Sequence, residues 1–416
     1  MEHAEIVIVG GGLAGAAAAE NYRKAGGTGS VTIISQEKNR PVHRPPLSKE
    51  YLRGDKEREE VFVHPGGFYD ENGITVKLET RVDAIDLPAK ELVLASGERY
   101  GFDTLVLATG ARPRRLSVPG ADLDGIFYLR SLESSERLQA ASNDARNAVV
   151  IGAGFIGMEV AASLTSRGVQ CTVVERGSHI WARLVPEVVS GFIRRLYEER
   201  GVQFRFGTGV QALEGERRVQ SVVLENGERL PADLVVAGVG AMLNTALAEA
   251  ADLETERGIV VDELFRTSCR RATGGTADVY AIGDVALFPD PIGGRIHTEH
   301  WDNALHQGRA LGKTLAGRPE PYDHVAYFFS DLFDLSLNMI GYPAGWDDII
   351  LRGDPSDGRF TAIYVKDDTV SAVLMLNDDQ HFDAWPALVR SRRSVVNVAN
   401  KLADPSFDPR EAGVSL

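Results

Sequence analysis

The chain has 416 residues, with 45 basic and 59 acidic side chains and a formal net charge of −14, which argues against nucleic acid and anionic membranes as general partners. With 44% apolar and 25% charged residues, it can bury large cores and should divide into two or three domains. We expect a soluble, cytoplasmic enzyme, because the sequence contains neither a signal-like N-terminal segment nor an 18-residue apolar run. The two cysteines, Cys171 and Cys269, offer neither a disulfide framework nor a CxxC redox pair.

Two glycine-rich motifs of the dinucleotide-binding type occur, GGGLAG at residues 10–15 and GAGFIG at residues 152–157. Each follows a short aliphatic run and begins an Ala-rich helical stretch, and about twenty residues later another strand is predicted, at residues 31–34 and 170–174. The first glycine of each motif permits a tight turn, the second lets the backbone approach a pyrophosphate, and the third lets the helix pack against the strand. The sequence therefore predicts two bound dinucleotides.

The two motifs also divide the chain. Residues 103–108 and 233–239 predict the strands that close the two nucleotide-binding units, and residues 278–284 predict a buried strand that returns the chain to the first unit. The first unit is interrupted by a Pro-rich loop at residues 40–49, and a longer segment between Thr267 and Asp278 predicts an exposed loop.

The pattern of predicted elements changes after about residue 322, where short strands and a final helix are predicted. The strands are residues 336–340, 348–352, 360–365 and 369–375, and the helix is near residues 384–402. We predict an α/β protein with two Rossmann-like domains and a C-terminal α+β domain. The predicted boundaries are 1–112 with 245–321 for the first domain, 113–244 for the second and 322–416 for the third.

Further motifs identify a family resemblance that spans essentially the whole chain. They are RPPLSK at 44–49, LATGARP at 107–113, YAIGDVA at 280–286, EHWDNA at 299–304 and FFSDLFDLSLNMIG at 328–341. The chain resembles the FAD-dependent NADH:ferredoxin reductases of oxygenase systems, such as putidaredoxin reductase and the reductases of aromatic-ring dioxygenases, and more distantly apoptosis-inducing factor. Glutathione-reductase-like enzymes resemble it in fold but carry a redox-active cysteine pair, which this sequence lacks.

The first dinucleotide would be FAD. Asp284 follows a glycine at the end of a predicted strand, and we expect its carboxylate to accept a hydrogen bond from the ribityl chain. The resemblance implies further contacts from Arg44, from Arg130 and from the backbone of Val82. In the family an acidic residue usually binds the adenosine ribose. In this sequence Gln36 occupies that position and Glu37 comes next, and either side chain can bind the ribose hydroxyls. The residues expected at FAD are Gly10, Gly12, Leu13, Ala14, Gly15, Gln36, Glu37, Arg44, Lys49, Val82, Ala108, Thr109, Gly110, Arg130, Gly283, Asp284 and Trp301.

The second dinucleotide would be NADH. Glu175 follows the second strand of that unit, where a carboxylate accepts from both ribose hydroxyls and repels a 2′-phosphate. Arg176 or Arg183 can pair with a 2′-phosphate instead if Glu175 turns away. The residues expected at NADH are Gly152, Gly154, Phe155, Ile156, Gly157, Glu159, Glu175, Arg183 and Gly240.

The reaction centre needs a cation near the flavin and a polar group that orients the nicotinamide. Lys49 and Glu159 are the candidates, and by resemblance they form a pair beside the flavin, with Trp301 over its edge. Phe329 departs from the family pattern, because many relatives have Trp at this position of the FxS motif. We expect no bound metal ion.

The resemblance implies that electrons pass from NADH through FAD to a [2Fe–2S] ferredoxin serving a cytochrome P450 or an aromatic-ring dioxygenase. Such a carrier would dock on a local basic rim, and the candidate residues, which can equally be ordinary surface charges, are Arg309, Arg390, Arg392 and Arg393. The alternatives are a rubredoxin reductase, an NADH oxidase, or an NADH-sensing interaction protein like apoptosis-inducing factor. We expect a monomer or weak dimer with no nucleic-acid or membrane partner.

Overall fold

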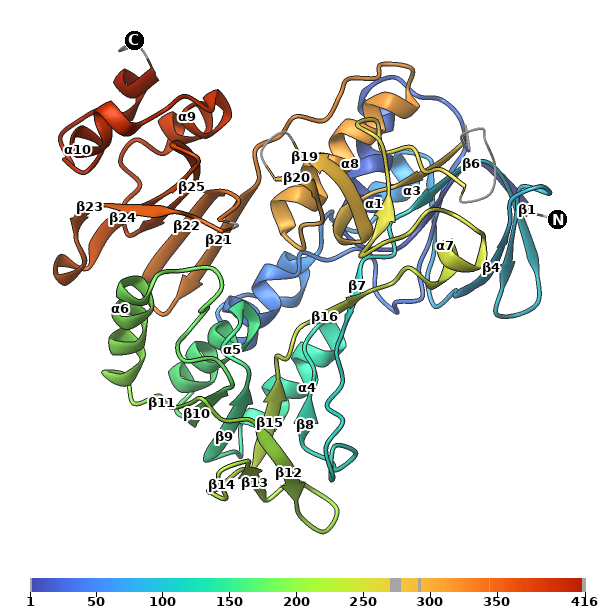
Figure 1. The fold of residues 1–416 in the computed structure, drawn as a ribbon. Coiled ribbons are helices and arrows are strands. Elements are labelled where there is room, and N and C mark those ends of the chain that lie inside the picture. Colours follow the sequence, from blue (N-terminus) through green and yellow to red (C-terminus); the bar gives the residue numbers. More distant parts are fainter. Residues whose placement is uncertain (1, 270–277, 291–292, 344, 414–416) are drawn as a thin grey trace. The chain divides into compact units, whose positions relative to one another are not determined.

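The computed structural model describes residues 2–269, 278–290, 293–343 and 345–413. The chain forms two compact units (Figure 1). Unit 1 consists of Met1–Arg44, Arg58–Arg112 and Ala241–His324. Unit 2 consists of Pro45–Glu57, Pro113–Gly240 and Val325–Leu416. The loop predicted between Thr267 and Asp278 falls mainly on residues 270–277, which lie outside the described residues.

Unit 1 is built on a sheet with the order β3-β2-β1-β6-β5-β4, in which β18 also pairs with β6. Its strands are β1 (Glu2–Val9), β2 (Val31–Ile34), β3 (Ile74–Lys77), β4 (Val82–Asp86), β5 (Glu91–Leu94), β6 (Arg99–Leu107) and β18 (Val279–Ala281). The pairs of β1 with β2 and β6, of β2 with β3, and of β6 with β18 are parallel, whereas β4 and β5 add an antiparallel hairpin. The Val- and Ile-rich sequences of the parallel strands match their burial on both faces.

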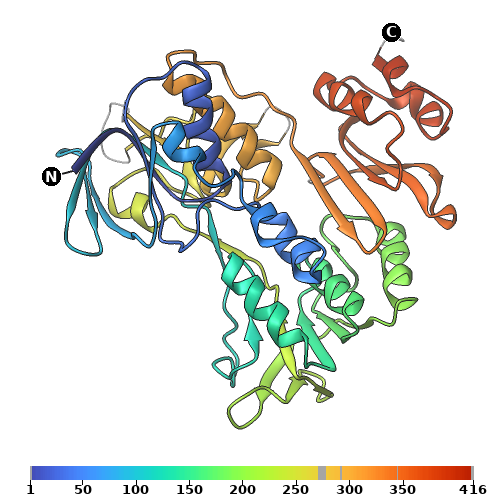
Figure 2. The same cartoon turned by 180° about the vertical axis from the view of Figure 1, so that it is seen from behind.

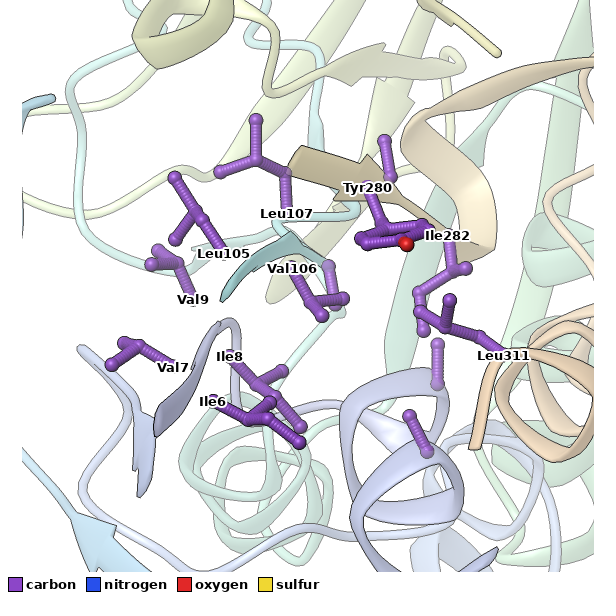
Figure 3. Close-up of a cluster of buried hydrophobic side chains, with 14 of the residues drawn as sticks. Ile6, Val7, Ile8, Val9, Leu105, Val106, Leu107, Tyr280, Ile282 and Leu311 are labelled. Carbon is purple, nitrogen blue, oxygen red and sulfur yellow. The ribbon is translucent and has the colours of Figure 1, made fainter. Parts of the chain in front are cut away.

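Two long helices of unit 1, α1 (Leu13–Lys24) and α8 (Trp301–Leu315), run side by side, as both Figure 1 and Figure 2 show. Glycines permit this approach, because a Cβ on Gly308 would lie 2.5 Å from the carbonyl oxygen of Ala14 and one on Gly312 would lie 2.7 Å from that of Ala18. The core gathers side chains of β1, β6 and β18 with Ile282 and Leu311 (Figure 3). The shorter elements of this unit are α3 (Phe68–Glu71), α7 (Ala246–Ala250), β16 (Ala241–Leu243), β17 (Ile259–Val260), β19 (Ala286–Asp290) and β20 (Gly294–Ile296).

The strand predicted at residues 278–284 is shorter than expected. β18 ends at Ala281, and Gly283 begins a 3₁₀ turn, Gly283–Val285, with a φ of 76°. This left-handed conformation favours glycine and takes the chain out of the sheet. Asp284 therefore lies in a turn just beyond the strand.

Unit 2 contains a second parallel sheet with the order β11-β10-β9-β15-β8. Its strands are β8 (Ile126–Phe127), β9 (Asn147–Ile151), β10 (Gln170–Glu175), β11 (Gln203–Phe206) and β15 (Leu234–Ala237). The helices of this region are α2 (Glu50–Arg53), α4 (Leu132–Ser142), α5 (Phe155–Ser166) and α6 (Glu187–Glu198). A small antiparallel sheet joins β12 (Val210–Glu214), β13 (Ser221–Leu224) and β14 (Arg229–Pro231), and β7 (Ala111–Pro113) pairs with β16 where the chain passes between the units.

The C-terminal part of unit 2 is an antiparallel sheet with the order β21-β22-β25-β24-β23. Its strands are β21 (Tyr327–Leu332), β22 (Leu335–Gly341), β23 (Asp348–Asp354), β24 (Arg359–Lys366) and β25 (Thr369–Leu376). The four strands predicted here are confirmed with small changes at their ends, and β21 was not predicted.

The single helix predicted near residues 384–402 is wrong. The structure has α9 (Trp385–Ser391) and α10 (Ala399–Leu402), separated by Arg392, whose φ of 50° ends the first helix. The buried guanidinium of Arg352 donates to the carbonyl oxygens of Leu402 and Asp404. It also donates to those of Pro405 and Phe407, so the final segment is shaped by a long-range side chain.

Candidate dinucleotide sites and reaction centre

The first glycine motif forms a close turn between β1 and α1 in unit 1. Gly10 has a φ of 131°, and a Cβ there would lie 2.1 Å from the carbonyl oxygen of Ala108. A Cβ on Gly15 would lie 2.6 Å from the carbonyl oxygen of Gly10, whereas one on Gly12 would meet no atom within 4 Å among the described residues. The turn is thus closed against the sheet and open at the start of α1, which is the geometry that a pyrophosphate requires.

Several residues predicted at FAD lie around this turn. Leu13 and Ala14 are buried in the first turn of α1, and Ala108 follows β6. The hydroxyl of Thr109 donates to the carbonyl oxygen of Asn244, and the Asn244 amide donates back to that of Thr109, both at 2.8 Å. Gly110 has a φ of 61°, whereas Val82 begins β4, at the edge of the same sheet, at a register shift.

The two candidates for the adenosine ribose differ in the structure. Glu37 accepts from the guanidinium of Arg44 at 2.6 Å, so two residues predicted at FAD are brought together, whereas Gln36 is exposed. The indole N–H of Trp301 donates to Nδ1 of His43 at 2.9 Å. Lys49 and Arg130, also expected at FAD, belong to unit 2.

The second glycine motif repeats the construction in unit 2. Gly152 has a φ of 100°, and a Cβ there would lie 2.4 Å from the carbonyl oxygen of Gly238. A Cβ on Gly157 would lie 2.0 Å from the carbonyl oxygen of Gly152, whereas one on Gly154 would have 3.9 Å to its nearest neighbour. The loop between β9 and α5 is therefore also shaped for a pyrophosphate.

Glu175 ends β10 beside this loop. Its carboxylate accepts from the backbone N–H of Ala153 and from that of Gly177, both at 2.7 Å. Arg176 is exposed and pairs with Glu225 at 2.6 Å, and Arg183 is exposed on the described surface. Gly240 is exposed with a φ of 94° at the last position of this segment of unit 2. Among the acidic and basic candidates, Glu175 is the one fixed against the motif.

The carboxylate of Glu159, on α5, is buried with 5% exposure. The hydroxyl of Ser330 donates to its Oε1 at 2.6 Å, and the hydroxyl of Ser48 donates to its Oε2. Burial raises the pKa of Glu159 above its ordinary value, while nearby Lys49 and the two hydroxyls act in the opposite direction. An exposed position for this carboxylate is thereby excluded.

Lys49 lies in the same cluster, although its ion pair is not the expected one. Within the described residues its Nζ pairs with Oδ2 of Asp331 at 3.5 Å, and its influence on Glu159 is electrostatic. The ammonium also lies 4.9 Å from the ring centroid of Phe329, the position at which the resemblance led us to expect Trp. Ser48, Ser330 and Asp331 were not among the predicted site residues, although the RPPLSK and FFSD motifs contain them.

An aromatic group lies next to the second glycine motif. The ring of Phe155 is 4.5 Å from that of Trp181 and 4.1 Å from that of Phe328, measured between centroids. Ile156, which is also among the residues expected at NADH, is 45% exposed. Trp181 and Phe328, from two other segments, therefore extend the apolar surface around Phe155.

The four arginines predicted to bind a carrier are exposed but fall in different units. Arg309 is on α8 of unit 1, whereas Arg390 is in α9 of unit 2 and is followed by Arg392 and Arg393. None of the described helices combines the length and apolarity needed to cross a membrane.

Two protein-family models match the chain and identify its family. The family model "Pyridine nucleotide-disulphide oxidoreductase" matches residues 4–308, and "Reductase C-terminal" matches residues 327–412. The chain belongs to the pyridine nucleotide-disulphide oxidoreductase family. Its architecture, two dinucleotide-binding domains followed by a C-terminal reductase domain, confirms the predicted fold class.

Relatives of similar length place the chain in the ferredoxin reductase branch of this family. It is 36% identical over 406 residues to a probable ferredoxin reductase of Castellaniella defragrans, covering 97% of both chains. It is 34% identical over 376 residues to a rubredoxin-NAD(+) reductase of Pseudomonas putida, covering 89% of this chain and 95% of the relative. A crystal structure of the covalent putidaredoxin reductase–putidaredoxin complex matches with a TM-score of 0.93 at 34% identity, covering 99% of this chain and 98% of the other.

These matches confirm the family resemblance and the enzyme class. The chain is a flavoprotein oxidoreductase of the ferredoxin reductase type, and its cofactors are FAD and a nicotinamide dinucleotide. The two shaped glycine turns, one in each unit, fit these two groups.

Proposed function

We propose that this enzyme passes electrons from NADH through FAD to a [2Fe–2S] ferredoxin that serves an oxygenase. The observation that carries the proposal is the state of the cysteines: Cys171 is buried in β10, and both Cys171 and Cys269 are free. The cysteine pair of glutathione-reductase-like enzymes is absent from this sequence, which favours electron transfer to a separate carrier over reduction of a disulfide. The 34% identity to a reductase crystallised with putidaredoxin supports an iron–sulfur protein as that carrier.

The roles of individual residues follow from the two turns and the buried cluster. FAD supplies hydride acceptance and electron release. In unit 1 the open turn at Gly12 would receive its pyrophosphate, Glu37 with Arg44 its adenosine end, and Asp284 its ribityl chain. In unit 2 Glu175 would accept from the ribose hydroxyls of NADH and disfavour a 2′-phosphate.

The buried cluster around Glu159 would orient the nicotinamide. Its carboxylate is fixed by two hydroxyls, so its rotamer is set before any ligand arrives. Lys49 supplies the positive charge of the cluster, and Phe155 with its aromatic neighbours offers an apolar surface that excludes water. No proton transfer by a side chain is needed for hydride transfer.

A rubredoxin is the second candidate carrier, favoured by the similarity to a rubredoxin-NAD(+) reductase. The two carriers would be distinguished by the docking surface alone. We also infer a cytoplasmic location, which free cysteines favour, and a monomer or weak dimer.

The test is a panel of [2Fe–2S] ferredoxins and rubredoxins, assayed by cytochrome c coupling at low and high salt. An acidic carrier that docks through arginines should be reduced much more slowly at high ionic strength, whereas ferricyanide reduction should change little. Reversing the charge of Arg392 with Arg393, and separately of Arg309, should raise the KM for the carrier, and Arg217→Glu, in an exposed loop of unit 2, is the control. If no carrier is reduced faster than oxygen, the carrier proposal is wrong.

A further inference from the structure

Three ligand-type side chains converge in unit 1, at the start of α8 and on the segment that follows this helix. Nε2 of His324 lies 2.6 Å from Oδ2 of Asp302, and Nε2 of His306 lies 3.4 Å from Oδ1 of the same carboxylate. The two imidazoles are stacked, with centroids 3.8 Å apart and planes inclined by 9°. One ligand atom from each residue lies within 4.8 Å of those of the other two.

From this geometry we propose that Asp302, His306 and His324 bind one divalent transition-metal ion of the Zn²⁺ class. A tetrahedral Zn²⁺ holds imidazole nitrogen and carboxylate oxygen at about 2.0–2.2 Å, so its ligand atoms lie about 3.4 Å from one another. The His306–Asp302 distance matches that value, whereas the His324–Asp302 contact of 2.6 Å is a hydrogen bond that must lengthen by side-chain rotation before both groups bind one ion. Because two of the three ligands are nitrogen, the site is unsuited to Mg²⁺ and Ca²⁺, which prefer oxygen.

Burial and exposure divide the site as an open metal centre requires. The Asp302 side chain is 8% exposed, whereas those of His306 and His324 are 33% and 26% exposed. The carboxylate thus forms the floor, and the solvent side leaves the fourth position to water.

Polar residues beside the ligands join the two segments that carry them. Asn303 and Gln307 are buried in α8, and each comes directly after one of the proposed ligands. The Gln307 amide donates to Oδ1 of Asn303 at 3.2 Å, and the Asn303 amide donates to the carbonyl oxygen of Thr298. The hydroxyl of Tyr322 donates to the same Asn303 oxygen at 3.2 Å. These bonds position the start of α8 and the segment just before His324, although none of them reaches a ligand side chain.

The ion would act as a clamp. His324 is the last residue of unit 1, so the metal would tie the end of this unit to α8. Gln307 also accepts from the backbone N–H of Gly283 at 2.7 Å, which joins the same helix to the turn that carries Asp284. No metal ion was expected from the sequence, and this site would be a correction to that expectation.

Zinc uptake by the full-length, FAD-loaded protein without a polyhistidine tag tests the site. After equilibrium dialysis against Zn²⁺ and elemental analysis, wild type should hold one more Zn²⁺ per chain than His306→Gln or His324→Gln. Loss of one ligand should weaken binding by more than the roughly 10- to 100-fold that loss of an outer partner produces. His3→Gln is the matched control, because His3 pairs with one carboxylate, Asp103, at an exposed position.

Thermal unfolding gives a second measurement. Zn²⁺ should raise the Tm of wild type and of the His3 variant, and should leave the Tm of both ligand variants unchanged, since an ion that binds only the folded state stabilises it. Both ligand histidines are partly exposed, so their variants should fold, with a Tm in EDTA lowered only by the loss of one contact with Asp302. Equal zinc uptake by wild type and both ligand variants, equal loss in the His3 variant, or competition by Mg²⁺ at similar concentration would overturn the proposal.

Discussion

The ammonium of Lys49 lies 3.5 Å from the carboxylate of Asp331, although the Lys49 side chain is 2% exposed and that of Asp331 is 53% exposed. A buried cation therefore has its ion-pair partner at the surface, where solvent weakens the attraction. Glu159, the buried carboxylate of the same cluster, is occupied by two hydroxyls. The positive charge of Lys49 is therefore only weakly neutralised inside the cluster and can act on a bound cofactor.

This arrangement predicts unequal effects of removing the two partners. Lys49→Gln should slow flavin reduction by NADH by about 10²-fold, the scale seen when one electrostatic donor of an active site is lost. Asp331→Asn should slow it by less than about 10-fold, because the lost carboxylate is exposed. Stopped-flow reduction of the bound flavin measures both, and a larger effect of Asp331→Asn would contradict the inferred role of Lys49.

Lys49 and Glu159 should also act as a unit. We expect Lys49→Gln combined with Glu159→Gln to reduce the flavin no more slowly than the more damaging single variant, because both side chains belong to one buried cluster and Lys49 acts electrostatically on Glu159. The same stopped-flow measurement decides this. Two rate losses that multiply would show that the residues work independently.

The buried carboxylate predicts a pH dependence of stability. Burial raises the pKa of Glu159 above 4.5, so the folded state holds this proton more tightly than the unfolded state. Its stabilising contribution is full below pH 4.5 and is lost as the pH rises through the folded pKa. The side chain of the Glu159→Gln variant stays neutral at every pH. The free energy of unfolding of this variant in urea should therefore increase relative to that of wild type as the pH rises. A difference that is constant with pH would contradict the raised pKa.

Coenzyme preference should depend on Glu175. Wild type should prefer NADH to NADPH by about 10²-fold in kcat/KM, and Glu175→Gln should narrow this ratio because the charge that repels a 2′-phosphate is removed. Arg176→Ala is the control, since Arg176 is already paired with Glu225 on the surface. Steady-state kinetics with both coenzymes measure the ratios. A wild type that prefers NADPH would assign the site to Arg176 or Arg183.

The close contact of α1 and α8 predicts a stability difference between two glycines. Gly308→Ala should destabilise the protein by about 1–3 kcal/mol, because its Cβ would lie 2.5 Å from the backbone of Ala14 and the two helices would have to separate. Gly191→Ala, in α6 with its nearest neighbour at 3.8 Å, should stabilise it by about 0.5–1 kcal/mol. Urea unfolding compares the two, and equal effects would contradict the packing argument.

Much of the fold could be predicted because its signals are local. The strand at residues 31–34 is confirmed at both ends, and the two glycine turns form between strand and helix as their spacing indicates. The helix near residues 384–402 could not be predicted correctly, because its interruption depends on a left-handed residue and on the buried Arg352. No periodicity within that segment carries such information.

The candidate site divides in the same way. Glu159 was identifiable as a carboxylate in an apolar helix, and Lys49 was identified through its motif. Their partners Ser330 and Asp331 lie 171 and 282 residues away along the chain, so only the folded structure shows these contacts. The convergence of His324 with Asp302 is likewise a tertiary contact, across 22 residues.

The segment Pro45–Glu57 belongs to unit 2, although the chain on both sides of it belongs to unit 1. One compact unit consequently contains all five residues of the buried cluster: Ser48, Lys49, Glu159, Ser330 and Asp331. A chimera that exchanged only residues 113–240 with a relative would transplant Glu159 away from the hydroxyls that hold it. Recombination between enzymes of this kind should therefore move three separate stretches of the gene together, and libraries that respect this grouping should yield more folded, reducible flavoproteins than libraries cut at the glycine motifs.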